Sequence, residues 1–363
     1  MIEFYNLTFA ELKTKPNIEF KDPYNIASTL NSEMKKAILV NPSGYREDEV
    51  CQILALDGDV VVGCTNPYSG RVRLNGEVYP AQNGSTLFSH EDYREENVGG
   101  ELFYRISTLH PSRNCFFCGI SQMAIGLYRV LKFNVFEFPR LIYLRKSRSV
   151  IQSILKTESP IIKLLIICAD VCLWLHRTAL SMFVKLTKGG YKVCKQVAVP
   201  QEVIDIMMED EHPFAEYHDK AWMEWNLNYS VAPEPRKKTL FTIEKDGKIE
   251  AFFLTKVQFF ETASSRGFKN VNLGTVMEWG ISKASKLTEK DINLLAIQSF
   301  DKDVDGIQVA TTDENLARKL KRYLFVGIGK ANFGVKIKSV KDPGLKDINN
   351  WRVRLAGCDT LMN

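Results

Sequence analysis

Apolar residues in the first half of the chain switch between the spacing of helices and the spacing of strands. The first predicted helix covers 24–39, where apolar side chains recur every four positions at Ile26, Leu30, Met34 and Ile38. Two strand-like runs follow, 50–55 and 60–64, joined by Asp57-Gly58-Asp59, a turn that favours hairpins. A third run, 77–89, follows Asn75-Gly76. The pattern therefore predicts a helix followed by a β-meander.

The rest of the first half predicts a helix, a short strand, a second helix and a closing strand. The first of these helices begins just after Arg94 and ends before Pro111, which cannot continue a helix. The apolar run 114–119 predicts a strand, and Ser121 is expected to cap a helix that reaches Leu131. A strand over 135–144, interrupted by Pro139, closes the half. This alternation indicates an α/β fold.

Beyond about residue 146 the pattern changes to two helical apolar stretches within 150–186, and from 201 the earlier order of signals returns. The repeated signals are a helical region (201–225), a hairpin (239–244 and 249–260), a strand (272–281), a helix (289–300), a strand (306–310), a helix (313–323) and terminal strands. We therefore predict an N-terminal domain (1–148), a helical linker (149–200) and a C-terminal domain (201–363). Because the halves share no obvious identity, divergent tandem duplication is a hypothesis.

One segment raises the question of a membrane. Residues 160–175 read PIIKLLIICADVCLWL and contain two charges, Lys163 and Asp170. Sixteen residues fall short of the roughly 20 apolar residues that a spanning helix needs. No integral span is expected, and a helix packed against protein is favoured over one lying on a membrane surface. Peripheral membrane contact stays open.

Composition narrows the class of protein. A length of 363 residues favours two domains, and 45% hydrophobic with 25% charged residues is typical of a folded protein. The net charge of +5 is too small to indicate a nucleic-acid partner. Eight cysteines without a disulfide-like pattern favour a reducing compartment, and the N-terminus does not resemble a secretory signal, so a cytoplasmic protein is expected. Cys115 and Cys118 lack a second pair to complete a zinc site, and no metal is expected.

The turn Arg94-Glu95-Glu96-Asn97-Val98-Gly99-Gly100 is the segment most suited to ligand chemistry. Asn97 tolerates a positive φ, and Gly99 and Gly100 expose their N–H groups without a side chain in the way. Outward amides at the start of a helix, with the helix dipole behind them, favour an anion such as a pyrophosphate. Glycines at a helix start also serve capping and close packing, so the turn alone is not specific.

Three features in the right order resemble the GCN5-related N-acetyltransferase (GNAT) family over about residues 20–145. Arg94 to Gly99 is similar to the family's phosphate loop, Q/R-x-x-G-x-G/A, with Asn97 in place of the first glycine. The segment 87–93, LFSHEDY, resembles the end of the family's central strand. The segment 121–133, SQMAIGLYRVLKF, resembles a later helix ending in A-x-x-L-Y-x-x-L-G-F, with Lys132 in place of glycine.

The resemblance implies two tandem GNAT-like folds, with a mixed and mostly antiparallel sheet flanked by helices. It also implies an acetyltransferase that uses acetyl-CoA, or another acyl-CoA, as cosubstrate. An acceptor amine or hydroxyl, on a small molecule or sugar, would attack the thioester directly. The residues implied to bind the cofactor are Leu87, Phe88, Ser89, Arg94, Glu95, Glu96, Asn97, Val98, Gly99, Gly100 and Ser121. Tyr128 falls on the position of the general acid that protonates the departing thiolate. The base is not identified, although Glu77, His90, Glu91 and Asp92 lie near the strand.

The second half is expected to be a degenerate copy. Residues 280–288 offer one glycine and no phosphate-loop spacing, which predicts a single coenzyme site. The segment 349–359 resembles the W-x-x-x-x-G-D-x-D tail of tandem acetyltransferase-like proteins, some of them associated with bacterial surface polysaccharides. Trp222 and Trp225 are expected to pack in a core rather than contact a sugar. Two alternatives remain, a non-catalytic ligand-binding or scaffolding protein of polysaccharide or envelope biosynthesis and an aminoacyl transferase that uses charged tRNA.

Overall fold

The structure is a computed structural model that describes residues 1–14, 20–26, 32–112, 114–148, 159–229, 237–260 and 270–358. The elements of the first half are β1 (Ile2–Thr8), α1 (Phe9–Thr14), α2 (Ser32–Leu39), β2 (Val50–Asp57), β3 (Val60–Leu74), β4 (Glu77–Ser89), α3 (Val98–Leu109), β5 (Cys115–Cys118), α4 (Ile125–Val130) and β6 (Asn134–Leu144).

The second half begins with a long helix and then repeats much of this order. Its elements are α6 (Pro160–Lys188), β7 (Lys192–Gln196), α7 (Gln201–Met208), β8 (Phe214–Glu216), α8 (Lys220–Asn228), β9 (Lys237–Lys245), β10 (Lys248–Phe260), β11 (Val271–Ile281), α9 (Glu289–Ser299), β12 (Gly306–Ala310), α10 (Glu314–Lys321), β13 (Phe325–Lys336), β14 (Trp351–Arg352) and α11 (Leu355–Cys358).

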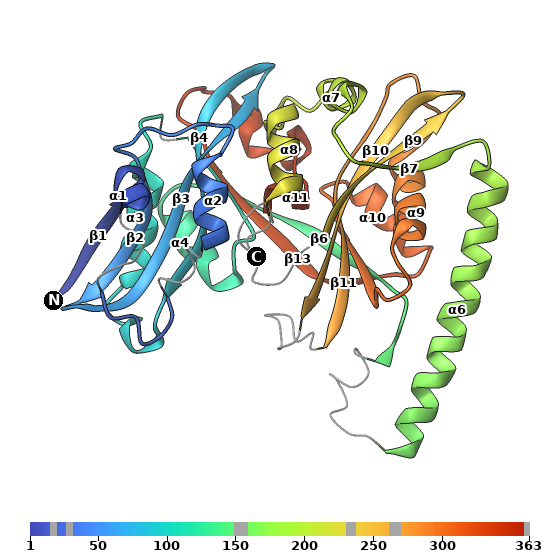
Figure 1. Cartoon of the computed structure of the whole chain (residues 1–363), viewed down its shortest axis with the longest axis horizontal. Helices are drawn as coiled ribbons and strands as arrows, with labels where there is room; N and C mark the ends of the chain where they lie inside the picture. The colour runs from blue at the N-terminus through green and yellow to red at the C-terminus, as the bar shows by residue number, and fades with distance from the viewer. Residues whose placement is uncertain are drawn as a thin grey trace.

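The strands of both halves join in one sheet, and the strands of each half follow one another in the same sequence order from the outer edge toward the centre. From the first edge the order is β1-β2-β3-β4-β5-β13, and from the other edge it is β7-β9-β10-β11-β12-β6. Most pairs are antiparallel, while β4–β5 and β11–β12 are parallel. Helices flank the sheet on both sides (Figure 1). The expected fold class, a mixed and mostly antiparallel sheet flanked by helices, is confirmed, and the repeated order of elements is a structural repeat.

The two halves exchange strands at the centre of the sheet. β13, from the end of the chain, pairs with both β5 and β6, and β6 in turn pairs with β12 of the second half. β7 lies within the expected linker but pairs with β9. The boundaries at 148 and 201 stay a prediction, and the exchange means that each half completes its sheet with a strand of the other.

The turns predicted from Asn-Gly and Asp-Gly pairs are present in the structure, because these residue types favour the positive φ angles of tight turns. The Asn75-Gly76 turn has φ values of 51° and 88°, and Asp246-Gly247 has 50° and 76°, as two-residue hairpin turns require. Of the helix expected over 24–39, residues 32–39 are helical, and 27–31 lie outside the described residues. The expected interruption of a strand at Pro139 is wrong, because β13 shifts register there and needs no N–H from that residue.

The core expectation for the aromatic helix is confirmed. Trp222, Met223 and Trp225 are buried in a cluster that also contains side chains of α1, α2 and α7. The indole nitrogen of Trp225 donates to the carbonyl oxygen of Ala37, over 2.8 Å, which satisfies its polar group. This cluster therefore packs a helix of the second half against α2 of the first.

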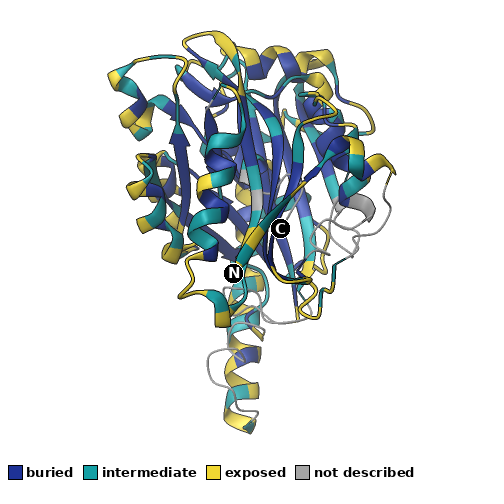
Figure 2. Cartoon of the chain, turned by 90° about the vertical axis from the view of Figure 1, so that its left-hand side faces the viewer, coloured by how far each residue is buried: buried dark blue, intermediate teal, exposed yellow. Residues whose placement is uncertain are grey.

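The apolar segment 160–175 belongs to α6, a helix of 29 residues, and the earlier part of the expected helical stretches, 149–158, lies outside the described residues. Ser159 caps it and Pro160 opens it, as both residues favour. No helix in the described ranges is both long and apolar enough to cross a membrane. The expectation of a helix packed against protein is wrong for most of its surface, because only Ile166, Leu180 and Val184 are buried and the helix extends past the edge of the sheet (Figures 1 and 2).

Candidate functional site

The candidate site begins where β4 and β5 separate. These parallel strands share one residue pair, Gln82 with Cys115, after which β4 follows β3 instead. The register between β3 and β4 then shifts, since Cys64 faces Phe88 while Asn66 faces Ser85. Thr86 has a φ of 52°, which marks a bulge that bends β4. The result is a fork between β4 and β5, in which the backbone of 85–89 does not pair with β5.

The start of α3 follows directly from this bent strand. After the 3₁₀ turn η2 (Glu91–Tyr93), Asn97 adopts a φ of 57° as the sequence predicts, and its side chain does not cap the helix. A β-carbon on Gly100 would overlap the Asn97 carboxamide, so a larger residue here would displace that side chain. A β-carbon on Gly99 would lie 3.4 Å from Ser89 Oγ, an ordinary contact. The first amides of α3 are therefore left without a side-chain cap at the fork.

α3 lies very close to the sheet at this point. A β-carbon on Gly63 of β3 would lie 3.0 Å from both the Phe88 carbonyl oxygen and Val98 Cγ1. Gly63 therefore lets the first turn of α3 approach the end of β4. Leu87 and Phe88 expose their side chains, as do the predicted residues Arg94 to Asn97. The structure brings the predicted residues 87–89 and 94–100 together on one edge of the molecule.

The other predicted residues lie across the fork on the side of β5. Tyr128 of α4 is buried against Phe103 of α3, with ring centroids 4.0 Å apart, and against Phe117 of β5. Burial raises the pKa of its phenol far above the usual value, so the group stays protonated. The expected cap by Ser121 is wrong, because this residue precedes the 3₁₀ turn η3 (Gln122–Ala124) and its side chain makes no capping hydrogen bond.

The candidate bases are spread over two places. Glu77 accepts a hydrogen bond from the Tyr79 hydroxyl at the opposite end of β4, about 40 Å from Ser89 along the strand, so it is wrong as a base. His90 stacks on Tyr24, with ring centroids 3.9 Å apart, beside the candidate site. The side chains of Glu91 and Asp92 are exposed in η2.

The equivalent position of the second half is closed. β11 and β12 pair over three residues and then separate, with a register shift opposite β10 beside Met277. The helix that follows, α9, has a capping box in which Thr288 and Asp291 bond to each other's backbone N–H. Lys188 pairs with the Asp291 carboxylate at 3.1 Å. At α9 the Asp291 amide donates to the Thr288 hydroxyl, whereas at α3 the residue before the helix provides no such acceptor. That the chain has a single coenzyme site stays a prediction.

A buried ionic cluster occupies the second fork, and the sequence did not predict it. Arg352 Nη2 donates to Glu278 Oε1 at 2.7 Å, and Arg352 Nε lies 2.8 Å from Asp210 Oδ2. His218 lies between two carboxylates, 3.1 Å from Glu216 Oε2 and 3.3 Å from Glu278 Oε2. The cavity that these side chains border is only about 10 Å³. We name Asp210, Glu216, His218, Glu278, Arg352 and Arg354 the central ionic cluster.

Pairing within the central ionic cluster keeps its members charged despite burial. Burial alone would lower the pKa of His218, but Glu216 and Glu278 together raise it above its usual 6.5. Burial alone would raise the pKa of Glu278, but Arg352 and then His218 lower it below its usual 4.5. No local pattern identifies this set, because its members come from β8, β11 and the C-terminal segment. Only the paired arginines of Trp351-Arg352-Val353-Arg354 mark one part of it in the sequence.

The central ionic cluster also touches the first fork. Asn83, the residue after the single β4–β5 pair, donates from Nδ2 to Glu216 Oε1 at 3.0 Å. Gly357 packs against the same carboxylate so closely that any β-carbon there would overlap it. The polar groups of the second half therefore reach the point where β4 and β5 separate.

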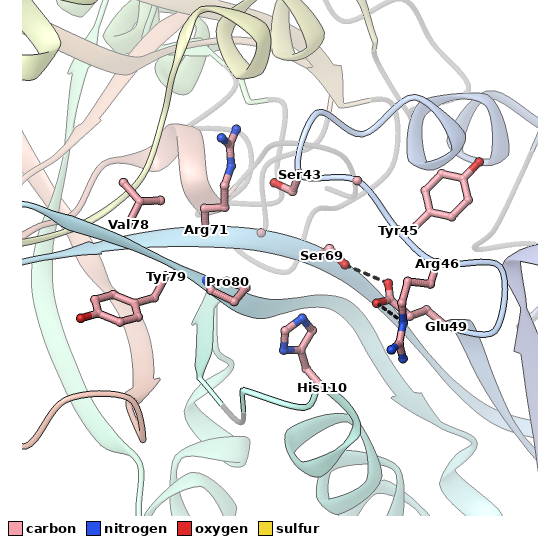
Figure 3. Close-up of a pocket in the computed structure, with 12 residues that line it drawn as sticks. Ser43, Tyr45, Arg46, Glu49, Ser69, Arg71, Val78, Tyr79, Pro80 and His110 are labelled. Carbon is pink, nitrogen blue, oxygen red and sulfur yellow. Dashed lines mark hydrogen bonds and ion pairs between the residues drawn. The ribbon is translucent and has the colours of Figure 1, made fainter.

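A separate cavity of about 350 Å³ lies at the other end of β4 (Figure 3). Its lining includes Ser69, Pro80 and His110, and Glu49 accepts a hydrogen bond from the Ser69 hydroxyl at 3.3 Å. Burial lowers the pKa of His110, so this ring is neutral at physiological pH. Six residues of strand, about 20 Å, separate Pro80 from the bulge at Thr86. This cavity is therefore not part of the fork.

Solved structures share this arrangement of strands and helices. N-myristoyltransferase of Saccharomyces cerevisiae with bound myristoyl-CoA matches with a TM-score of 0.54 and 13% identity, covering 92% of this chain and 82% of that one. The chain has a tandem GNAT-like fold. A GCN5-related N-acetyltransferase of Anabaena variabilis also matches, with a TM-score of 0.52 and 9% identity over 93% of this chain and 73% of that one.

Of the comparisons with known proteins, only the one with solved structures finds matches. No family model matches the sequence, and no curated protein matches it. A second structure of the yeast N-myristoyltransferase, with myristoyl-CoA and inhibitors, matches with a TM-score of 0.55 at 13% identity, covering 92% of this chain and 79% of that one. At such identities the comparison establishes the fold, and the activity must be argued from the site.

Proposed function

We propose that the chain is an acyl-coenzyme A-dependent acyltransferase with one coenzyme site, in the fork between β4 and β5. The observation that carries the proposal is the difference between two equivalent helix starts. The first amides of α3 have no side-chain cap and face the fork, whereas Thr288 and Asp291 cap α9. An uncapped helix start beside a bent strand offers backbone donors to a pyrophosphate and to an amide-containing arm.

In the proposed mechanism, backbone N–H groups make most of the contacts with the coenzyme. The amides of Val98, Gly99 and Gly100 would bind the pyrophosphate, and the pantetheine arm would lie along 87–89. An acceptor amine or hydroxyl, on a small molecule or sugar, attacks the thioester carbonyl, and the C–S bond breaks as the new bond forms. Backbone N–H groups of the strand stabilise the oxyanion. The acceptor loses its proton to solvent, Tyr128 gives its proton to the departing thiolate and is reprotonated from solvent, and no metal takes part.

A thermal-shift experiment with a matched pair of variants tests the coenzyme site. Gly99→Val should keep the fold, because a β-carbon there makes only an ordinary contact with Ser89, but its branched side chain should keep a phosphate from the amides. Gly126→Val makes the same change in α4, where nothing lies within 4 Å. We expect acetyl-CoA or myristoyl-CoA to raise the melting temperature of the parent and of Gly126→Val, and not of Gly99→Val. No shift in the parent at millimolar coenzyme would contradict the proposal.

The second candidate is a GNAT-like ligand-binding or scaffolding protein without catalysis. Asn97 in place of the family's glycine favours it, as does the bond between Asn83 and Glu216, which occupies both polar groups nearest the fork. Release of free thiol from acetyl-CoA, measured across amino sugars and small amines, separates the two candidates. Coenzyme binding without thiol release for any acceptor would favour the non-catalytic protein.

A further inference from the structure

α6 carries an unusual share of the exposed apolar surface. Of the 24 large apolar side chains that are exposed in the described ranges, ten lie in this one helix. They are between 42% and 85% exposed: Ile161, Leu164, Leu165, Ile167, Val171, Trp174, Leu175, Met182, Phe183 and Leu186. Isolated exposed apolar residues are common, but a concentration of this kind marks an interaction surface.

These ten side chains form one continuous face. At 100° per residue they span an arc of about 180°, from Trp174 to Phe183, on the side of the helix opposite Ile166 and Val184. A 29-residue helix is about 43 Å long, so half of its surface covers roughly 700 Å². Exposed patches above a few hundred Å² are rare on proteins that act alone. We name these ten residues the α6 apolar face.

The charges of α6 are placed beside this face and not within its centre. Lys163 and Lys185 lie along one border, on either side of Trp174, whereas Arg177 lies close to Ile166 on the side that faces the protein. The one carboxylate of this helix, Asp170, accepts a hydrogen bond from the Ser147 backbone N–H at 2.6 Å and so faces the body of the protein. The border is therefore basic, which complements an anionic surface.

A second copy of the chain fits this face less well. The positions at heptad spacing, from Ile161 to Leu186, are all apolar and would form the seam of a paired helix. In the middle of this seam lie Cys168, Cys172 and Ala179, whose small side chains offer little packing area. Coiled coils carry charges beside such a seam, where this helix has Leu164 and Val171. Ile167 and Trp174 lie outside the seam altogether. The arc is wider than a paired helix would cover.

We propose that α6 binds an anionic lipid surface, with its axis in the plane of the membrane. The α6 apolar face enters the boundary between headgroups and acyl chains, and the basic border contacts lipid phosphates. Trp174, at the edge of the face, lies at the headgroup level that amphipathic aromatic rings favour. The projection of α6 beyond the sheet lets the face reach a flat surface while Leu180 and Val184 hold the helix to the core (Figure 2). This proposal does not depend on the proposed enzymatic activity.

Trp174 provides a direct reporter for this binding. It is 54% exposed, whereas Trp222, Trp225, Trp279 and Trp351, the other four tryptophans, are at most 5% exposed. We expect vesicles of phosphatidylcholine with phosphatidylglycerol to shift its emission to shorter wavelength and to sediment the full chain. Vesicles of phosphatidylcholine alone should bind more weakly, because they lack the anionic charge. Trp174→Phe should remove the emission shift and keep most of the sedimentation.

A pair of double variants separates this face from general apolar exposure. Leu164→Glu with Leu175→Glu should weaken vesicle binding at least tenfold, since each buried leucine contributes about that factor. Val40→Glu with Val78→Glu places the same charges on exposed valines of the first half and should leave binding unchanged. Both doubles should keep the parent's melting temperature, because all four side chains are exposed.

Two results would overturn the proposal. The first is Trp174 emission that does not respond to anionic vesicles. The second is an emission shift that grows with protein concentration in lipid-free buffer and accompanies a dimer on sedimentation, which would assign the α6 apolar face to a second copy of the chain. If coenzyme still raises the melting temperature of the Leu164→Glu, Leu175→Glu variant, the coenzyme site does not depend on the α6 apolar face.

Discussion

At the scale of single residues, the candidate site depends on the backbone of Asn97 and on the burial of Tyr128. Asn97 has the positive φ that its residue type tolerates, and its carboxamide lies against Gly100. The burial of Tyr128 among aromatic rings of α3 and β5 depends on elements far apart in sequence, so its raised pKa could not be predicted from the residue.

Tyr128 yields a prediction about catalysis. If Tyr128 supplies the proton to the departing thiolate, Tyr128→Phe should lower kcat by about a hundredfold or more while coenzyme still raises the melting temperature. Thiol release at saturating acetyl-CoA measures the effect. Because phenylalanine preserves the ring packing on Phe103, an unchanged kcat would assign Tyr128 to packing alone.

His218 yields a prediction about stability and pH. Its pKa is raised in the folded state, so its contribution is complete below its usual pKa of 6.5 and is lost as the pH rises through the raised value. Glu278 has a lowered pKa, so its contribution is present above 4.5 and is lost as the pH falls through the lowered value. Melting temperature should therefore be highest between these values and decline on the alkaline side. In His218→Gln that alkaline decline should flatten, and an unchanged profile would contradict the pairing.

At the scale of elements, the two helix starts illustrate how the repeat diverged. α3 and α9 follow equivalent strands, but Thr288 and Asp291 provide at α9 a cap that no side chain provides at α3. The sequence predicted that the second half lacks a phosphate-binding turn, because residues 280–288 contain only one glycine. The capping box itself is a local signal, Thr288 followed three residues later by an acidic residue, and could also have been found.

The cap on α9 leads to a prediction about stability alone. Thr288→Ala should lower the free energy of unfolding by about 1 kcal/mol, because the Asp291 backbone N–H loses its acceptor. Urea denaturation measures this loss. The variant should keep the full coenzyme shift in melting temperature, since α9 takes no part in the proposed site; loss of that shift would indicate a second coenzyme site.

At the scale of the whole molecule, strand exchange joins the two halves, and the central ionic cluster links segments of the second half and contacts the first half through Asn83. β13 lies between β5 and β6, so neither half has a complete sheet without the other. Arg352, near the end of the chain, binds Glu278 of β11 and Asp210 after α7. We expect the chain to unfold as one cooperative unit rather than as two domains.

Arg352 yields the prediction at this scale. Arg352→Met should lower the free energy of unfolding by about 3–5 kcal/mol, because Glu278 would remain buried without its principal partner. Lys330→Met removes the exposed pair with Glu137 and should change stability by less than about 1 kcal/mol. Urea denaturation of both variants compares the two pairs. Equal effects would mean that the buried pairs of Arg352 stabilise the fold no more than an exposed pair does.

The sequence by itself determined the local features: the hairpin turns, the order of elements, the start of α3 and the absence of a phosphate turn before α9. Each depends on the φ preferences or hydrogen-bonding groups of a few neighbouring residues. The tertiary structure decided the exchange of β6 and β13, the central ionic cluster and the exposure of the α6 apolar face. These depend on which distant segments meet, and the apolar pattern of α6 reads the same whether protein, lipid or water lies against it.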